Sequence, residues 1–309
     1  MVKEVGPEKA SWLLEQAGLK GLESMTRLDG GWDNANFLLR LIDGYEVVLK
    51  AWIANDVDEV GRVVRRHVHL NSHGIPTTVP LRLLNGDFFA EREGIAWTLI
   101  PYVSGGMLGE DEGSLKSLGI ALSRMSLIPA ADCFPREYRM GFSLFDKVLK
   151  SKSEKVDREF IEILSSEVSN LKSVIPENLP LGVLHGDLFP DNVIGSDGGE
   201  VLAILDLEEA WIGPRAFDLA MAFVGFGWED GKPVEKSWKA LVDGYQSISE
   251  LSQAEISALP ILHRFATLSI ACWRYWKHNL TAPDVSLSER YVEMVERLSV
   301  EFDFSGAFE

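Results

Sequence analysis

The chain has 309 residues, of which 46% are apolar and 25% charged, as in a soluble globular protein large enough for one large domain or two lobes. Its formal net charge of −17 disfavours nucleic acid and anionic membranes as main partners, because both are polyanions. Cys133 and Cys272 are far apart and predict no disulfide framework. With no signal-peptide pattern at the start, we expect a cytoplasmic protein.

The first hundred residues predict a small antiparallel β-lobe with an embedded helix. A short amphipathic helix is expected at 7–18, and a longer one at 56–73 that ends before Gly74. The turn Asp43-Gly44 is a strong hairpin signal. The expected strands are Leu38–Ile42, Tyr45–Ala51, Val79–Leu84, Phe88–Arg92 and Ile95–Val103.

After Gly105-Gly106 the pattern becomes mainly helical. Helical spacing covers 113–127, 142–172, 235–248, 254–280 and 286–302. Short apolar strands are expected near Gly182–Leu184, Asn192–Ile194 and Val201–Leu205. We therefore expect an α+β fold with two lobes, a nucleotide-binding β-lobe over 1–104 and a helical lobe over 105–309.

One stretch indicates the chemistry. It runs His185-Gly186-Asp187, reaches Asn192 after a Pro-Asp step, and is followed by Asp206 at the end of the next strand. Phosphoryl transfer to a hydroxyl needs a carboxylate near the acceptor and oxygen ligands for Mg²⁺. Asp and Asn are also common in turns, so each residue alone indicates little. Their joint pattern between apolar strands favours a catalytic loop.

The string H-G-D-x-x-x-x-N with a following I-L-D-x-E resembles the signature of small-molecule kinases of the aminoglycoside phosphotransferase and choline kinase type. Gly213–Ala220 is similar to their G-x-x-x-x-D-L-A segment. The resemblance implies a two-lobed protein-kinase-like fold that uses ATP and Mg²⁺. The implied roles are catalytic base for Asp187, Mg²⁺ ligands for Asn192 and Asp206, and supports of the catalytic loop for His185 and Asp218.

The resemblance also implies a nucleotide site in the first lobe. Residues 31–37 are similar to a glycine/asparagine phosphate loop, Lys50 to the phosphate-binding lysine, and 100–103 to the hinge whose backbone binds adenine. Lys50 can equally be a solvent-facing lysine at a strand end. Relatives pair this lysine with a helix glutamate; Val63 occupies that place here, and Glu59, one turn earlier, is the expected substitute. The implied contact residues are Gly31, Asn34, Asn36, Lys50, Glu59, Ile100, Tyr102 and Val103.

The acceptor pattern is mixed. Arginine suits carboxylate recognition, as for homoserine, whereas tryptophan faces suit a quaternary ammonium, as for choline. The string Leu-Phe-Pro-Asp-Asn-Val resembles bacterial homoserine kinases, but Asp206-x-Glu208 is closer to choline kinases and some antibiotic kinases. The aromatic residues can also be core, and Arg274 can pair with a structural acid. The candidate acceptor residues are Glu208, Trp211, Trp273 and Arg274.

The expected function is transfer of the γ-phosphate of ATP to a hydroxyl of a small metabolite, with a homoserine-like amino alcohol as the first candidate. Choline, ethanolamine or an aminoglycoside is the alternative acceptor. A catalytically inactive pseudokinase is the alternative from another class, but the base, the metal ligands and the lysine are all present in the sequence. A protein kinase is disfavoured because the sequence has no D-F-G or A-P-E. The oligomeric state is not predicted.

Overall fold

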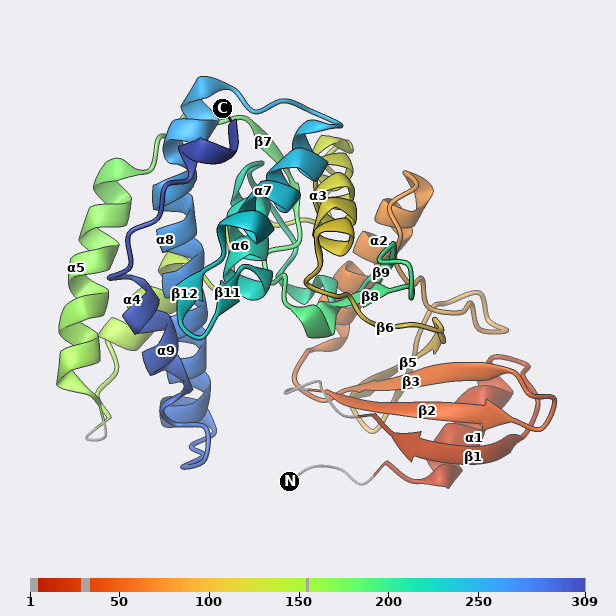
Figure 1. Ribbon diagram of the computed structural model, residues 1–309. Coiled ribbons are helices and arrows are strands. Elements are labelled where there is room, and N and C mark those ends of the chain that lie inside the picture. The colour runs from red at the N-terminus through yellow and green to blue at the C-terminus, as the bar shows by residue number, and fades with distance from the viewer. Residues whose placement is uncertain (1–4, 29–33, 154–155, 309) are drawn as a thin grey trace. The chain divides into compact units, whose positions relative to one another are not determined.

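The computed structural model describes residues 5–28, 34–153 and 156–308, and its chain divides into two compact units (Figure 1). The first unit comprises Met1–Gly106 together with Leu202–Leu207. The second comprises Met107–Val201 and Glu208–Glu309. The segment around Asp206, expected in the helical lobe, therefore belongs to the first unit.

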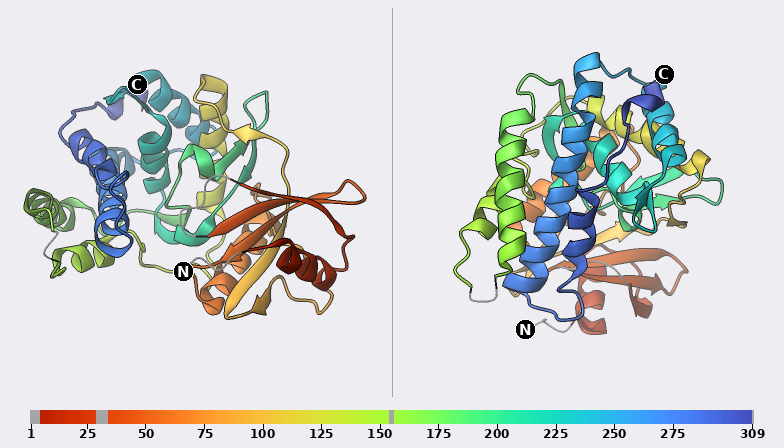
Figure 2. Two further views of the ribbon diagram at one scale, coloured as in Figure 1. Left: turned by 90° about the horizontal axis from the view of Figure 1, so that it is seen from below. Right: turned by 60° about the vertical axis from the view of Figure 1, so that its left-hand side comes forward.

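The first unit is built on a five-stranded antiparallel sheet with the order β1-β2-β3-β5-β4. Its strands are β1 (Leu22–Arg27), β2 (Ala35–Leu41), β3 (Glu46–Trp52), β4 (Ala90–Arg92) and β5 (Ile95–Pro101). Alternate side chains, such as Leu39, Leu49 and Leu99, point to one face and are buried there. The short helix α1 (Pro7–Gln16) covers this face with Leu13 and Leu14 (Figures 1 and 2).

The helix α2 (Val57–Ser72) follows β3 in the first unit. Asp56 begins it by accepting a hydrogen bond from the N–H of Glu59, as N-cap aspartates do. Val60, Val63 and Val64 are buried along one side of the helix. The place that relatives give to a glutamate is thus a buried apolar position here.

Two strand predictions in this unit need correction. The segment Val79–Leu84 forms no regular strand, because Pro80 has no N–H to donate to a ladder. Only Ala90–Arg92 of the expected strand Phe88–Arg92 pairs with β5. The strand β1 was not predicted, because it lies at the sheet edge with mostly exposed side chains and lacks apolar alternation.

The second unit is mainly helical and packs around the long helix α8. Its helices are α3 (Glu112–Leu127), α4 (Phe142–Leu149), α5 (Arg158–Val174), α6 (Phe217–Phe226), α7 (Glu235–Gln246), α8 (Gln253–Tyr275) and α9 (Arg290–Arg297). The helices α5 and α9 lie beside α8 (Figure 2). The helix α4 and the helix α5 replace the single helix expected at 142–172, and α9 is shorter than the expected 286–302.

The helix α8 starts at a capping box formed by Ser252 and Glu255, and a π-helical turn, Trp276–Thr281, follows it. By length and composition Gln253–Thr281 is apolar enough to cross a membrane. However, 67% of its most apolar window is buried inside the protein. Such burial is typical of the core helix of a soluble protein.

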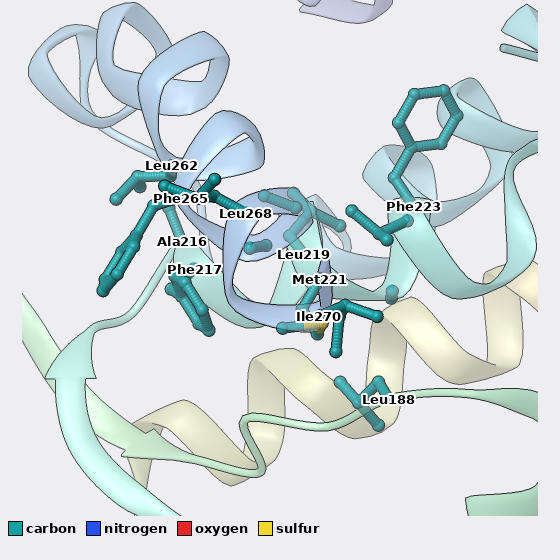
Figure 3. Close-up of a cluster of buried hydrophobic side chains, with 14 of the residues drawn as sticks. Leu188, Ala216, Phe217, Leu219, Met221, Phe223, Leu262, Phe265, Leu268 and Ile270 are labelled. Carbon is teal, nitrogen blue, oxygen red and sulfur yellow. The ribbon is translucent and has the colours of Figure 1, made fainter. Parts of the chain in front are cut away.

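The core of the second unit includes the packing of α6 against α8, and Leu219, Met221, Leu262 and Leu268 belong to its cluster of buried side chains (Figure 3). Residues on every side of α6 are buried. A uniformly apolar segment has no 3.6-residue period, which explains why the helix was not predicted. At Gly225 an added Cβ would lie 2.2 Å from the carbonyl oxygen of Leu188. The glycine therefore lets α6 pack directly on the loop that follows Asp187.

Short strands complete the second unit. The strand β7 (Leu181–Leu184) pairs with β10 (Trp211–Pro214), so that the loop after β7 starts beside Trp211. The remaining short strands of the chain are β6 (Gly106–Met107), β8 (Val193–Gly195), β9 (Val201–Ile204), β11 (Trp228–Glu229) and β12 (Lys232–Pro233).

Candidate active site

The side chain of Asp218, in the first turn of α6, holds the backbone of the loop after β7. Its carboxylate accepts hydrogen bonds from the backbone N–H of His185 at 2.5 Å and of Gly186 at 3.0 Å. The residue is buried, and this burial raises its pKa to about 7, against the opposing effect of the two N–H donors. Asp218 thus fixes the backbone immediately before Asp187.

Within this loop Asn192 fixes Asp187. Its Nδ2 donates to the backbone oxygen of Asp187 at 2.8 Å and to Oδ2 of the same residue at 3.3 Å. The N–H of Asp187 donates to Nδ1 of the buried His185 at 3.1 Å, so this ring nitrogen acts as an acceptor. Because Nδ2 of Asn192 faces Asp187, its amide oxygen points away and is the atom suited to a divalent cation.

Tyr138 closes the other side of the loop. Its hydroxyl donates to the carbonyl oxygen of Gly186 at 2.5 Å, and its ring stacks on Trp211 with centroids 5.1 Å apart. Burial, with the charges of Asp187, Glu209 and Asp218, raises the pKa of Tyr138 well above 10, so the hydroxyl remains a donor. Gly186 has φ of 84°, and a Cβ there would lie 2.8 Å from the carbonyl oxygen of Glu209 and 3.0 Å from the Tyr138 ring. No other residue type fits this position without strain.

In the first unit Lys50 and Asp206 form an ion pair. Nζ of Lys50 lies 3.3 Å from Oδ1 of Asp206 and 3.9 Å from the ring centroid of Trp52. Lys50 is directly opposite Asn36 on β2 and Thr98 on β5, and side chains opposite each other in a ladder share a face. These residues therefore line the face of the sheet that α1 does not cover.

Asp206 has a left-handed φ of 55°, which is rare for a non-glycine residue. Two hydrogen bonds hold the backbone on either side of it. Before it, the Thr77 hydroxyl donates to the carbonyl oxygen of Ile204 at 2.7 Å. After it, Nη1 of Arg66 on α2 donates to the carbonyl oxygen of Leu207 at 2.9 Å. The unusual backbone of Asp206 is thus fixed from both ends.

Glu59 differs from expectation. Its carboxylate binds Arg62 at 2.6 Å and Arg66 at 3.0 Å, and the ion pair of Lys50 is with Asp206. The reason is helical spacing, because residues three and seven positions after Glu59 lie on its own side of α2. Glu59 is therefore linked through Arg66 to the backbone next to Asp206.

The remaining nucleotide-side candidates fall into three groups. Gly31 lies outside the described residues. The amide oxygen of Asn34 is turned inward, where it accepts hydrogen bonds from the N–H of Ile53 at 3.0 Å and of Ala54 at 3.3 Å, so it holds the turn after β3. Ile100 lies near the end of β5, and Tyr102 and Val103 lie in the segment that follows.

Arg274 is not placed as a carboxylate clamp. Its buried guanidinium donates to the carbonyl oxygen of Arg290 at 3.0 Å and to Glu293 at 3.1 Å, and so ties α8 to α9. The sequence left open that Arg274 pairs with a structural acid, and Glu293 is such an acid. Trp211 is buried behind the loop against Tyr138, and Trp273 packs against the helical core, while Glu208 is partly exposed.

Sequence reasoning missed Tyr138 and the ion pair between Arg139 and Glu209. Nε of Arg139 donates to Oε1 of Glu209 at 2.8 Å. No motif marks residues 138 and 139, because their partners lie 48 and 70 residues away along the chain. Only the fold brings them to the catalytic loop.

Asn192 and Asp206 are the candidate ligands for a divalent metal. In the described part of the chain no group of three or more His, Cys, Asp or Glu side chains is arranged to hold a metal. Mg²⁺ in phosphoryl-transfer enzymes is typically held by one or two protein ligands together with substrate phosphates. Asn192 and Asp206 are oxygen donors of that kind.

A family model described as a phosphotransferase enzyme family matches residues 24–251. The chain belongs to this family. A homoserine kinase from Agrobacterium fabrum is 30% identical over 277 residues, covering 87% of this chain and 85% of that protein. One from Phenylobacterium zucineum is 29% identical, covering 86% and 83%.

Solved structures share the fold of this family member. An amicoumacin kinase in complex with AMP-PNP and Ca²⁺ has a TM-score of 0.71 at 16% identity, covering 92% of both chains. A Plasmodium vivax ethanolamine kinase has a TM-score of 0.70 at 13% identity, covering 97% of this chain and 96% of that one. The expected protein-kinase-like α+β fold is confirmed, and so is the enzyme class. This phosphotransferase transfers a phosphoryl group from ATP to a small-molecule hydroxyl.

Proposed function

We propose that this phosphotransferase is a cytoplasmic, ATP- and Mg²⁺-dependent homoserine kinase. The observation that carries the proposal is the Asp187–Asn192 pair, held in a loop whose backbone is fixed by the buried Asp218. Homoserine kinases from several bacteria, 26–30% identical to this chain, support the choice of acceptor.

In the proposed reaction Asp187 accepts the proton of the acceptor hydroxyl as the hydroxyl oxygen forms its bond to the γ-phosphorus. The bond between that phosphorus and the oxygen it shares with the β-phosphate breaks, and ADP leaves. Asn192 donates to Oδ2 of Asp187 and so helps to orient the carboxylate of the proposed base. Lys50, in the first unit, is the cation that binds the phosphates of ATP in the proposed reaction.

Asn192 and Asp206 would hold Mg²⁺, which when bound neutralises charge on the phosphate oxygens. The left-handed backbone from which the Asp206 carboxylate extends is held by Thr77 and Arg66. Fixed ligands lose little freedom on binding, so the arrangement supports a metal role for this residue.

The decisive experiment compares acceptors. We expect ADP release with MgATP to be fastest on homoserine, with kcat/KM at least about 100-fold above choline, ethanolamine or an aminoglycoside, because a charged group without a partner is costly to desolvate. Mass spectrometry should identify O-phosphohomoserine as the product. A clear preference for choline or ethanolamine would reject homoserine as the acceptor.

Asp187→Asn is the matched catalytic control. It keeps the size of the side chain and should lower kcat by about 10²–10⁴, the usual contribution of a positioned general base. The affinity for ATP should stay within about twofold of that of the unaltered enzyme, because Asp187 is assigned no contact with the nucleotide. Turnover within a few-fold of the unaltered enzyme would remove Asp187 from the role of base.

A further inference from the structure

The proposed function, on which this inference rests, does not yet assign a partner to the carboxylate of the acceptor. Homoserine carries a carboxylate, and a carboxylate that leaves water needs a cation. The arginine expected to provide it, Arg274, is buried against Glu293 between α8 and α9. The cation should instead lie beside Asp187, on a side chain that solvent can reach.

The loop that precedes α4 lies directly against the backbone before Asp187. The Tyr138 hydroxyl donates to the carbonyl oxygen of Gly186 at 2.5 Å. The same loop also contacts β10, the partner strand of β7, because the N–H of Ile212 donates to the carbonyl oxygen of Pro135 at 2.8 Å. Residues 135–138 are therefore fixed relative to the catalytic loop within the second unit, and the next side chain along the loop is that of Arg139.

Arg139 is exposed but held in place. Its side chain is 53% exposed, whereas its partner Glu209 is only 8% exposed. Both Nε and Nη2 of the guanidinium bind the same carboxylate oxygen, Oε1 of Glu209. The backbone of Glu209 in turn packs on Gly186, where an added Cβ would meet its carbonyl oxygen. Glu209 itself thus packs on Gly186, next to Asp187, and Arg139 follows Tyr138, which also contacts Gly186.

This arrangement has the chemistry of an amino-acid carboxylate site. A guanidinium is planar, carries five N–H donors and can serve two carboxylates at once, which an ammonium cannot do with the same geometry. A buried partner that orients an exposed guanidinium before the ligand arrives reduces the entropy lost on binding. We propose that Arg139, oriented by Glu209, receives the carboxylate of the acceptor and makes the enzyme select a hydroxy amino acid over the corresponding amino alcohol.

The test compares homoserine with 3-aminopropan-1-ol, which is homoserine without its carboxylate. In Arg139→Met the KM for homoserine should rise about 10- to 100-fold, the usual value of a charge-assisted hydrogen bond, while kcat stays within about threefold. The kinetic constants for 3-aminopropan-1-ol should not change. Arg139→Lys should recover part of the loss, and Arg136→Met, an exposed arginine of the same loop, should behave as the unaltered enzyme.

The outcomes separate this inference from the proposed function. If the unaltered enzyme phosphorylates homoserine and Arg139→Met leaves its KM unchanged, or lowers kcat equally for both acceptors, the inference is wrong and the proposed function stands. If the unaltered enzyme does not phosphorylate homoserine, the proposed function fails and the inference with it. Unfolding midpoints and ATP affinity, measured for each variant, identify a folding defect. In that case the KM of the unaltered enzyme for homoserinamide decides, because a carboxylate site predicts a rise of at least about 10-fold.

Discussion

Replacing Arg66 by methionine tests whether α2 fixes the segment that carries Asp206. Arg66 is 2% exposed and bridges Glu59, at 3.0 Å, to the carbonyl oxygen of Leu207, at 2.9 Å. Removing one partner of a buried ion pair costs about 3–5 kcal/mol when the other charge is left unpaired. Glu59 keeps Arg62 at 2.6 Å, so the lost bond to Leu207 should dominate, with a decrease of about 1.5–3 kcal/mol in the free energy of unfolding.

The effect on catalysis should follow from the position of Leu207 next to Asp206. Loss of a residue that orients a metal ligand typically weakens metal affinity about 10- to 100-fold, so the Mg²⁺ concentration for half-maximal turnover should rise by at least about 10-fold in Arg66→Met. Urea unfolding gives the stability, and turnover at fixed ATP against Mg²⁺ gives the metal dependence. Arg62→Met is the matched control, because it removes the partly exposed partner of the same glutamate. The reasoning is refuted if the two variants have the same stability and the same Mg²⁺ dependence.

Two further predictions concern a metal ligand and a buried base. Asp206→Ala should abolish turnover, and raising Mg²⁺ should restore little of it, since a carboxylate ligand is gone; a normal Mg²⁺ dependence would place the metal elsewhere. His263 is buried among aromatic rings, and burial, with the charges of Arg297 and Arg264, lowers its pKa from 6.5 to about 3. Below pH 6.5 the unfolded chain binds a proton that the folded protein does not, so stability falls with pH down to about 3, by up to about 4–5 kcal/mol. Urea unfolding across this pH range should show a shallower loss in His263→Phe than in the unaltered protein, and parallel profiles would contradict the assignment.

Short-range sequence patterns predicted those elements whose structure depends mainly on residues close to one another in the chain. The Asp43-Gly44 hairpin, the helix α2 and the loop from His185 to Asn192 depend on short-range turn, capping and strand signals, and each lies where the sequence put it. The helix α6 has no amphipathic period because it is buried on all sides, and the edge strand β1 has few buried side chains to alternate.

Roles that depend on distant partners could not be predicted in the same way. Arg274 looked like a ligand-binding cation because its acid, Glu293, lies 19 residues further along the chain on another helix. No sequence motif marked Arg139 as a functional residue, since its partner Glu209 is 70 residues away along the chain. Residue type and spacing show what a side chain can do, whereas its partner in the fold decides what it does.

The first unit contains residues from two separate parts of the chain, and this affects when it can finish folding during synthesis on the ribosome. Its sheet is complete once Pro101 has been made, but the stretch Leu202–Leu207, which Thr77 and Arg66 bind, emerges only after residues 107–201. At about 5–20 residues per second, roughly 5–20 s pass in which the buried Arg66 has no Leu207 carbonyl to bind. The first unit can therefore complete its folding only after Leu202–Leu207, in the middle of the chain, has been synthesised. A fragment that stops at Gly106 is an incomplete unit.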